Sequence, residues 1–378
     1  MNRKLVALTA IVLIVLIAVS LFLTLNQTTS RQFYVGVEYA YGNQVIEVQA
    51  LVDRVKNYTN LFVLGSVGLT FNQTALTEAS DYIFHAKLNF IVLFTGLDMY
   101  SYNITQWMVD AQLKYGDRFL GIYKYDEPGG NQLDMGASQI INRTIIGTNA
   151  TYTDVANSYV GNLSSHVDYY RENAHVKLFT ADYGLYWFDY KSNYNAIFAF
   201  VGNQSRQRII ALDRGAAQAF NKDWGVIVNW KYDQPGSPYL ESGNELYTDL
   251  SLAYSSGAKY AIVFSYPKIG TYGTLTDEHF ETLQKFWNIL HTNPGSFGSN
   301  KPEAAYIVPK DYGFGFRNPN DNIWGLFPAD TQSAKIYNDT NTLTAKYGSR
   351  YDILYDEPQV EPLLGCYSQV FYWNQTVP

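Results

Sequence analysis

The sequence predicts an α/β protein: a (β/α)8 barrel, the TIM-barrel arrangement, followed by a small α/β unit. Short β-rich runs alternate with longer amphipathic stretches from Tyr34 to Leu290, which is the pattern of parallel strands joined by helical crossovers. Several runs are continuously apolar, such as Ile91–Phe94 and Ala261–Phe264, as expected of strands covered on both faces. The 378 residues are 47% hydrophobic and 16% charged, so the chain can bury a large core.

Eight strands are expected in the barrel, with amphipathic helices between them. The strands are Tyr34–Tyr39, Leu61–Leu64, Phe90–Phe94, Phe119–Tyr123, Val176–Thr180, Ala196–Val201, Val226–Trp230 and Tyr260–Phe264. The helices are Val45–Val55, Ala75–Ala86, Thr105–Leu113, Ser205–Phe220, Glu245–Tyr254 and Asp277–Leu290. A doubly wound sheet is the alternative, although no glycine-rich phosphate-binding motif supports it.

Two segments interrupt the alternation of strands and helices. Gly129–Asn173 is long and partly helical, and we expect it to form an excursion above the barrel after the fourth strand. Gly184–Asn195 is aromatic and too short for a full crossover helix. Both irregularities lie in the middle of the expected barrel.

A linker is expected at Asn293–Lys301, where Pro, Gly, Ser and Asn accumulate. The chain is therefore divided into residues 1–30 as a membrane anchor or signal peptide, residues 31–294 as the barrel and residues 302–378 as the small unit. The small unit is expected to contain three strands and one helix. They are the strands Ala304–Val308, Tyr351–Leu354 and Gln369–Trp373 and the helix Gln332–Tyr347.

The N-terminus predicts export. Arg3 and Lys4 precede a mostly apolar run from Leu5 to Leu25, and about 20 apolar residues span a bilayer as a transmembrane helix. The positive-inside bias then places the rest of the chain outside the cytoplasm, as a single-pass protein of the cell membrane. A cleaved signal peptide ending near Ala18–Ser20 is the alternative, and the protein would then be secreted.

Glycosylation motifs also indicate an exported chain, since Asn-x-Ser/Thr is an acceptor only outside the cytoplasm. Ten such motifs are spread over almost the whole sequence. They begin at Asn26, Asn57, Asn72, Asn103, Asn142, Asn149, Asn162, Asn203, Asn338 and Asn374. The sequence therefore predicts a glycoprotein.

Charge and composition argue against several classes of partner. The net charge is −7 and no basic run follows Lys4, whereas nucleic-acid binding needs clustered Lys and Arg. The single cysteine, Cys366, excludes an intrachain disulfide. The five histidines are scattered without a close pair, which disfavours a zinc site. No nucleic acid, metal or cofactor is expected.

Candidate site residues follow from the rule that barrel chemistry lies where the strands end. The rule selects carboxylates and tyrosines after strands one, four, five, seven and eight: Glu38, Asp126, Glu127, Asp182, Tyr183, Asp233 and Tyr266. Glycoside hydrolysis needs carboxyl groups of this kind, one protonated and one charged. Repulsion between close carboxylates would raise the pKa of one of them and so supply the acid.

The most distinctive motif is Lys124–Gly129, which reads Lys-Tyr-Asp-Glu-Pro-Gly. Lys231–Gly236 repeats it with Gln in place of Glu, and Tyr355–Pro358 repeats its central four residues. Because a residue before proline is pushed into an extended conformation, Glu127 would be held at a fixed angle. The alternative is that these motifs are only turns that end strands.

An Asp-Glu pair ending strand four resembles the arrangement in hexosaminidase-type glycoside hydrolases of families 20 and 123. The resemblance implies that Asp126 orients the substrate and that Glu127 is the acid/base. The layout also resembles family 42 β-galactosidases, in which the barrel precedes a flavodoxin-like, glutamine-amidotransferase-like unit that helps to assemble oligomers. Retaining enzymes with two glutamates expect Glu after strand seven, where this chain would need Asp233 or Glu241 instead.

Two hypotheses follow for the function. The first is an extracytoplasmic glycoside hydrolase acting on glycans or polysaccharide, with catalytic Glu127, Asp126 and Asp233. Its substrate would be bound by Glu38, Asp182 and Tyr183, and by stacking on Trp187, Trp230 and Tyr266, although an aromatic cluster such as that around Trp187 is more often packing. The second is a non-catalytic carbohydrate-binding or cell-envelope protein on the same scaffold.

Overall fold

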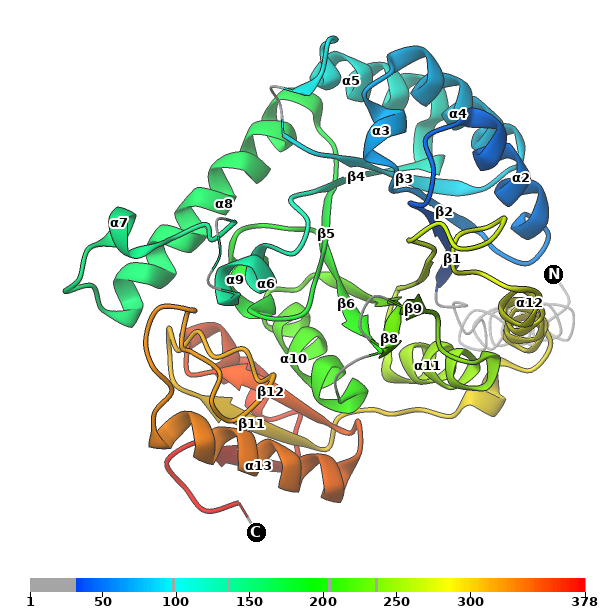
Figure 1. Ribbon diagram of the computed structural model, residues 1–378. Coiled ribbons are helices and arrows are strands. Elements are labelled where there is room, and N and C mark those ends of the chain that lie inside the picture. The colour runs from blue at the N-terminus through cyan, green and yellow to red at the C-terminus, as the bar shows by residue number, and fades with distance from the viewer. Residues whose placement is uncertain are drawn as a thin grey trace, which may run out of the picture. The chain divides into compact units, whose positions relative to one another are not determined.

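Eight parallel strands close into a barrel in the computed structural model, which describes residues 32–96, 99–134, 136, 138–202, 205–234 and 237–377, with only the backbone for 232–234 and 237. The barrel order is β1-β10-β7-β6-β5-β4-β3-β2, as Figure 1 shows along the barrel axis. The strands are β1 (Tyr34–Tyr39), β2 (Leu61–Leu64), β3 (Asn89–Phe94), β4 (Phe119–Lys124), β5 (Leu178–Asp182), β6 (Ala196–Val201), β7 (Asp223–Val228) and β10 (Tyr260–Phe264). The predicted barrel is confirmed, and the doubly wound alternative is wrong.

The barrel interior is closed by side chains near the amino ends of the strands. Tyr34 stacks on Tyr260 with ring centroids 5.2 Å apart, and Phe179 stacks on Phe198 at 5.6 Å. These rings belong to one buried cluster that includes Leu61 and other strand residues. Because this end is filled, open space inside the barrel is left toward the carboxyl ends of the strands.

Helices surround the barrel as an outer ring (Figure 1). The long ones are α2 (Val45–Val55), α4 (Gln73–His85), α5 (Ile104–Tyr115), α8 (Tyr152–Ala174), α10 (Arg206–Ala219), α11 (Gly243–Ser256) and α12 (Asp277–Thr292). The short ones are α3 (Val67–Thr70), α6 (Pro128–Leu133), α7 (Arg143–Ile146) and α9 (Tyr186–Lys191). The bounds differ from the predicted ones by a few residues, and α9 confirms the short connection expected in Gly184–Asn195.

The prediction of an excursion over Gly129–Asn173 is wrong for most of that segment. Residues 152–174 form α8, a 23-residue helix that begins with a capping box between Thr151 and Asp154. Its apolar residues recur at helical spacing and are buried against the barrel, among them Val155, Tyr159 and Leu163. The many polar residues between them had obscured this pattern, and only the part before α8 leaves the ring.

A small parallel sheet follows the barrel. It contains β11 (Ala304–Val308), β12 (Tyr351–Tyr355) and β13 (Gln369–Tyr372) in the order β12-β11-β13, with α13 (Thr331–Tyr347) and the short α14 (Glu361–Leu364). The predicted elements of this unit are confirmed. The barrel and this sheet belong to one compact unit, Tyr34–Pro378. Independent folding of residues 302–378 stays a prediction.

Two sets of contacts hold the C-terminal sheet on the barrel. Helix α10 lies against β12 so closely that a Cβ on Gly215 would come within 2.6 Å of the Ile353 carbonyl oxygen. In addition, the loop between β11 and α13 meets the segment around α6, where the Gln132 side chain donates to the Trp324 carbonyl at 2.8 Å. Trp324 is fully buried there. The sheet thus contacts both the outer ring and the segment after β4.

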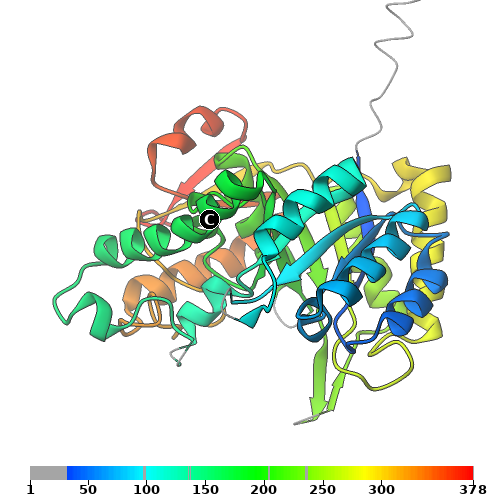
Figure 2. The ribbon, with the colours of Figure 1, turned by 90° about the horizontal axis from the view of Figure 1, so that it is seen from above.

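A two-stranded hairpin follows β7. Lys231–Gln234 (β8) pairs antiparallel with Ser237–Tyr239 (β9), and Figure 2 shows the hairpin extending beyond the end of the barrel. The second copy of the Lys-Tyr-Asp motif therefore forms a strand of this hairpin, whereas the first copy ends β4. The two copies do not occupy equivalent places in the barrel.

The predicted anchor from Leu5 to Leu25 lies outside the described residues. Within the described part of the chain, no helix has the length and apolar character needed to cross a membrane.

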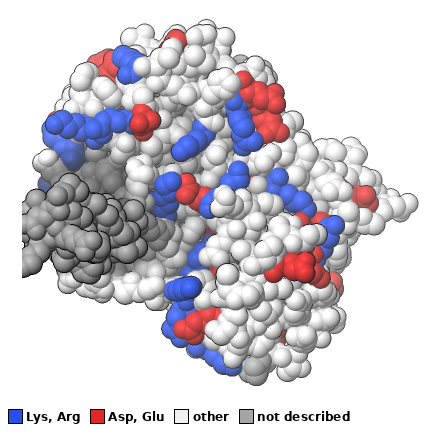
Figure 3. Space-filling model, turned by 180° about the vertical axis from the view of Figure 1, so that it is seen from behind, with Lys and Arg blue, Asp and Glu red and all other residues white. Residues whose placement is uncertain are grey.

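Charged side chains on the surface are mixed in sign. On the face in Figure 3, Lys and Arg alternate with Asp and Glu between wide uncharged areas. Exposed ion pairs such as Arg54–Asp277 at 2.6 Å and Lys56–Asp53 at 2.7 Å add little stability, because water screens them. The ion pairs that matter for the fold are the buried ones.

Candidate active site in the barrel mouth

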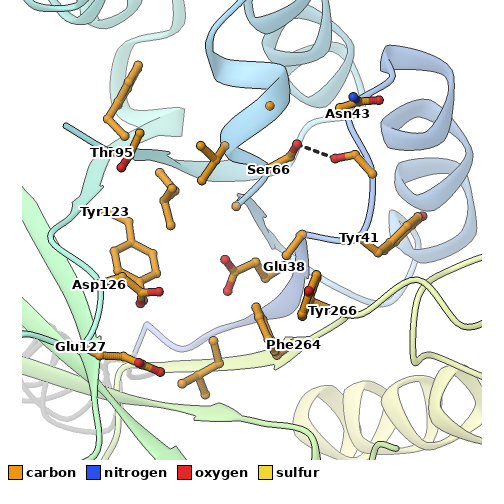
Figure 4. Close-up of a pocket in the computed structure, with 18 of the residues that line it drawn as sticks. Glu38, Tyr41, Asn43, Ser66, Thr95, Tyr123, Asp126, Glu127, Phe264 and Tyr266 are labelled. Carbon is orange, nitrogen blue, oxygen red and sulfur yellow. Dashed lines mark hydrogen bonds between the residues drawn. The ribbon is translucent and has the colours of Figure 1, made fainter. Parts of the chain in front are cut away.

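A cavity of about 1270 Å³ opens where the barrel strands end. Residues at or just after the ends of β1, β2, β3, β4, β7 and β10 line it, including Glu38, Thr95, Glu127 and Tyr266 (Figure 4). This is the end at which barrel enzymes carry their chemistry. The cavity is also larger than the roughly 300–1,000 Å³ typical of small-molecule sites.

Four carboxyl groups line this cavity, those of Glu38, Glu47, Asp126 and Glu127. Figure 4 shows the side chains of Glu38, Asp126 and Glu127 directed into it from opposite walls. Glu38 belongs to β1 and is 2% exposed, whereas Asp126 and Glu127 follow β4 and reach the water inside the cavity. The structure therefore brings together the two carboxylates of the central motif and the one from β1.

The surroundings keep these carboxyl groups protonated to unusually high pH. Burial, and then the charge of Asp126, raises the pKa of Glu38 well above its ordinary value. Poor hydration raises the pKa of Glu127 to about 8, with further contributions from the charges of Asp126, Asp182 and Asp134. The pKa of Asp126 is raised less, because a hydrogen bond from the Tyr123 hydroxyl favours its charged form. The cavity thus holds a neutral and a more readily ionised carboxyl side by side.

Backbone strain marks the loop that carries the Asp-Glu pair. Tyr125 and Glu127 both have positive φ, 66° and 52°, a region that residues other than glycine seldom adopt. Strand β5 holds this conformation: the Thr180 hydroxyl donates to the Tyr125 carbonyl at 2.5 Å, and the Glu127 amide donates to the Ala181 carbonyl at 3.1 Å. The extended conformation predicted for Glu127 from the following proline is therefore wrong. Strain stored in this way is common at functional sites.

Asp182 anchors the same loop instead of lining the cavity. It is fully buried at the end of β5, and its carboxylate accepts the amide hydrogens of Gly129 at 2.5 Å and Gly130 at 2.8 Å. Both glycines lie in the first turn of α6, which begins directly after Glu127. Tyr183 donates its hydroxyl to Asp134 and does not line the cavity either. Both residues, predicted to bind substrate, support the wall behind it.

Trp187 lies in the contact with the C-terminal sheet. It is 2% exposed, its ring stacks on Tyr355 with centroids 5.0 Å apart, and its indole N–H donates to Glu357 at 3.2 Å. Lys191 also pairs with Glu357, at 2.9 Å. Trp187 thus takes part in packing, as the alternative for the aromatic cluster predicted. The third copy of the Asp-Glu-Pro motif contributes Glu357 to this contact.

The end of β7 supplies aromatic and amide groups to the cavity. Asn229 and Trp230 line it, together with Tyr266 after β10. The side chain of Asp233 lies outside the described ones. Glu241 does not line the cavity: it is fully buried and pairs with Lys231 at 3.0 Å and with Arg206 at 3.5 Å. Glu241 is therefore not the missing carboxylate of strand seven.

Some site residues were missed in the sequence. Tyr123 looks like one more apolar residue of β4, yet its hydroxyl binds Asp126. Gly65, directly after β2, leaves room for Glu38, because a Cβ there would lie 1.9 Å from a Glu38 carboxylate oxygen. Their position at strand ends was the available signal, but neither is a residue type that by itself predicts catalysis.

Stability should decrease as pH rises from 6 to 8. Burial raises the pKa of fully buried carboxyl groups in the folded state, to about 7 for Asp182 and about 8 for Asp249, and well above the ordinary value for Glu38, Asp189 and Asp213. The folded state then binds more protons than the unfolded one, so stability is lost as pH rises through these values. At about 1.4 kcal/mol per pKa unit, Asp182 and Asp249 alone would cost on the order of 4 kcal/mol between pH 6 and pH 8.

Calorimetry at the two pH values checks this. The melting temperature should fall by roughly 10 °C from pH 6 to pH 8. Carboxyl groups with lowered pKa, such as Glu357, titrate below this interval and do not affect the comparison. A melting temperature that is constant or higher at pH 8 would contradict the assignment of neutral buried acids.

No protein-family model and no curated protein sequence matches the chain. Among solved structures, α-L-fucosidase isoenzyme 2 from Paenibacillus thiaminolyticus aligns with a TM-score of 0.52 and 10% identity, over 90% of this chain and 64% of that one. A β-1,4-D-mannanase from Cryptopygus antarcticus aligns with a TM-score of 0.44 and 14% identity, over 71% of this chain and 92% of that one. An endo-1,4-β-mannanase from Eisenia fetida aligns with a TM-score of 0.44 and 9% identity, over 67% of this chain and 90% of that one. The chain spans less than two thirds of the fucosidase, and at this identity the likeness establishes a shared barrel fold.

Proposed function

We propose that the chain is a glycoside hydrolase in which Glu127 is the general acid and Asp126 is the charged carboxylate. The observation that carries this is a carboxyl group with a pKa of about 8 that opens into the barrel cavity beside a second, more readily ionised one. A neutral acid and an anion at one site are what cleavage of a glycosidic bond requires. The fold alone would not decide this, because barrels host many chemistries.

The cleavage would use these side chains as follows. Glu127 donates its proton to the leaving glycosidic oxygen as the bond to the anomeric carbon breaks. Asp126, held by the Tyr123 hydroxyl, stabilises the positive charge that develops on the sugar ring. Trp230 and Tyr266 offer apolar faces along the cavity for neighbouring rings of the glycan. Water then completes the hydrolysis at the anomeric carbon.

The substrate would be met outside the cytoplasm, as the N-terminal apolar run and the glycosylation motifs favour. Asn26 and Asn203 lie outside the described residues. In the described part of the chain every other acceptor asparagine is exposed, except Asn142, which is half-buried. Accessible acceptors support the proposal of a membrane-anchored or secreted glycoprotein. A role of the C-terminal sheet in oligomer assembly stays a proposal that rests on the family 42 resemblance.

The pH dependence of hydrolysis tests the role of Glu127. With an uncharged alkyl glycoside, whose leaving group must be protonated, kcat/KM should fall above pH 8, because the acid loses its proton at its pKa of about 8. Below that value the acid is protonated, and activity should persist until Asp126 takes up a proton at more acidic pH. An uncharged substrate ensures that only the enzyme titrates. A rate that stays constant from pH 7 to pH 10 would exclude Glu127 as the acid.

A non-catalytic carbohydrate-binding barrel is the second candidate. It is favoured by the end of β7, where the described side chains are Asn229 and Trp230 and neither is a carboxylate. In that case glycans would bind in the cavity without cleavage, and replacing both Asp126 and Glu127 by their amides would leave binding intact. Incubation of a bound glycan with the intact protein, followed by mass spectrometry, separates the two candidates.

A further inference from the structure

Three of the four carboxyl groups that line the cavity, those of Glu38, Asp126 and Glu127, have no cationic partner among the described residues. No Lys or Arg of that part of the chain forms an ion pair with Glu38, Asp126 or Glu127. Of the cavity's two lysines, Lys268 pairs with Glu47 at 2.5 Å, and Lys124 donates to the Thr95 carbonyl and lies 5.7 Å from the Tyr170 ring. These three carboxyl groups therefore lack an ion-pair partner, and a bound cation would favour their charged forms.

Glu38 is the group that most needs a partner. Its side chain is 2% exposed, its Oε2 has no hydrogen-bond partner among the described residues, and Figure 4 shows its carboxyl group directed into the cavity. Polar atoms buried to this degree are nearly always hydrogen-bonded. The end of β2 also accommodates this carboxyl, because Gly65 leaves space that a Cβ, 1.9 Å from Oε1, would close. The unsatisfied oxygen thus points to a ligand group that donates hydrogen bonds.

An organic ammonium fits this place better than a metal ion. The described residues contain no group of three or more Asp, Glu, His or Cys side chains placed to hold a metal. An ammonium group has three N–H donors and bridges carboxylates at hydrogen-bond distances, which are longer than metal–oxygen bonds. The rings of Tyr123 and Phe264 also line the cavity, and aromatic faces attract such cations.

We propose that Glu38 and Asp126 bind the amino group of the substrate, so that the preferred glycans contain 2-amino-2-deoxy sugars with a free amine. Asp126 faces the anomeric carbon in the proposed reaction, and the amine is carried on the adjacent ring carbon. Glu38, which interacts electrostatically with Asp126 from the opposite wall, lies on the side where that substituent would be received. The preference for amino-sugar glycans rests on the proposed function. The binding of a cation by Glu38 and Asp126, here called the cation site, does not depend on it.

Binding of monosaccharides to the whole protein tests the cation site. Glucosamine, glucose and N-acetylglucosamine have the same ring and differ only in the substituent on the second carbon, which is charged in glucosamine alone. Their affinities, measured by calorimetric titration, therefore show the effect of that charge on binding. Glucosamine is expected to bind about tenfold or more tightly than the other two. In Glu38→Gln, which keeps the shape of the side chain, this preference should vanish. Gly65→Ala should weaken it by displacing the Glu38 carboxyl without removing the charge.

Glu47→Gln is the matched control. Glu47 lines the same cavity, but its carboxylate already accepts hydrogen bonds from Lys268 and from the Tyr39 hydroxyl at 2.8 Å. The preference for glucosamine should therefore survive in this variant. Equal affinities for the three sugars in the intact protein, or a preference that survives in Glu38→Gln with an unchanged melting curve, would overturn the cation site.

Cleavage assays separate this site from the proposed function. Oligomers of glucosamine should be hydrolysed faster than neutral glucose oligomers of the same length. If neutral oligomers are cleaved in a Glu127-dependent way with no preference for the amine, the hydrolase stands and the amino-sugar site fails. If glucosamine binds through Glu38 but no glycan is cleaved, the cation site stands and the hydrolase fails.

Discussion

Glu127→Gln is expected to lower kcat for glycoside cleavage by about 10²–10⁴-fold, with substrate binding changed only slightly. Glutamine has the shape of glutamate, but it cannot donate a proton to the leaving oxygen. The loss should be large for substrates with an alkoxide leaving group, which must be protonated. It should be small for aryl glycosides with an acidic phenol, which leave without help. Steady-state kinetics on the two substrate types measures the difference.

Glu172→Gln is the control for this experiment. It makes the same chemical change on the exposed side of α8, outside the cavity, and it should leave both rates unchanged. Because Glu127 is also strained, folding of the variant is verified by its melting curve. An equal loss for both types of leaving group would show that the residue acts on structure and not as an acid, and an undiminished rate for both would remove it from the reaction.

Arg214→Met is expected to destabilise the protein by about 3–5 kcal/mol, because it leaves Asp352 as an uncompensated buried charge. Arg214 on α10 is 2% exposed and pairs with Asp352 on β12 at 2.7 Å. It also donates to the carbonyl oxygens of Ser349 at 2.7 Å and Tyr351 at 2.9 Å. Denaturant unfolding measures the loss. Limited proteolysis should also show earlier cleavage around residues 293–303, where the C-terminal sheet joins the barrel.

The exposed pair Arg350–Glu303 provides the comparison. It has a similar distance of 2.9 Å, but its side chains are 42% and 51% exposed, so Arg350→Met should cost less than about 1 kcal/mol. The double variant Arg214→Met/Asp352→Leu should recover part of the stability lost in the single one, since no buried charge then remains. Similar costs for Arg214→Met and Arg350→Met would refute the importance of burial.

Much of the fold could be predicted because its signals are local. The apolar runs of the barrel strands are long enough to identify each strand and its burial on both faces. Helix α8 was missed because its buried residues are separated by a polar, motif-rich sequence. The conformation of Glu127 was missed for a different reason: β5 imposes it through hydrogen bonds from residues far away in the chain, and these outweigh the local preference before proline.

The site could be predicted only in part. The strand-end rule correctly selects Glu38, Asp126, Glu127 and Tyr266 as residues of the cavity. Trp230, proposed separately as a substrate-binding residue, also lines it. The rule cannot predict whether the side chain of a strand-end residue points into the cavity or away from it. Asp182 was therefore selected on the same grounds, although it secures the loop from behind. Trp187 was selected as part of an aromatic cluster, and it joins the C-terminal sheet.

The contact between Gln132 and Trp324 joins the loop between β11 and α13 to the segment that carries the proposed acid. Gln132 lies five residues after Glu127, and Arg143 makes a second bond to this loop, at 2.8 Å from the Leu326 carbonyl. The segment after Glu127, the proposed acid, is thus secured by residues that follow the barrel in the chain. A version trimmed to the eight strands and their helices would contain every proposed catalytic group but would lack the scaffold that fixes one of them.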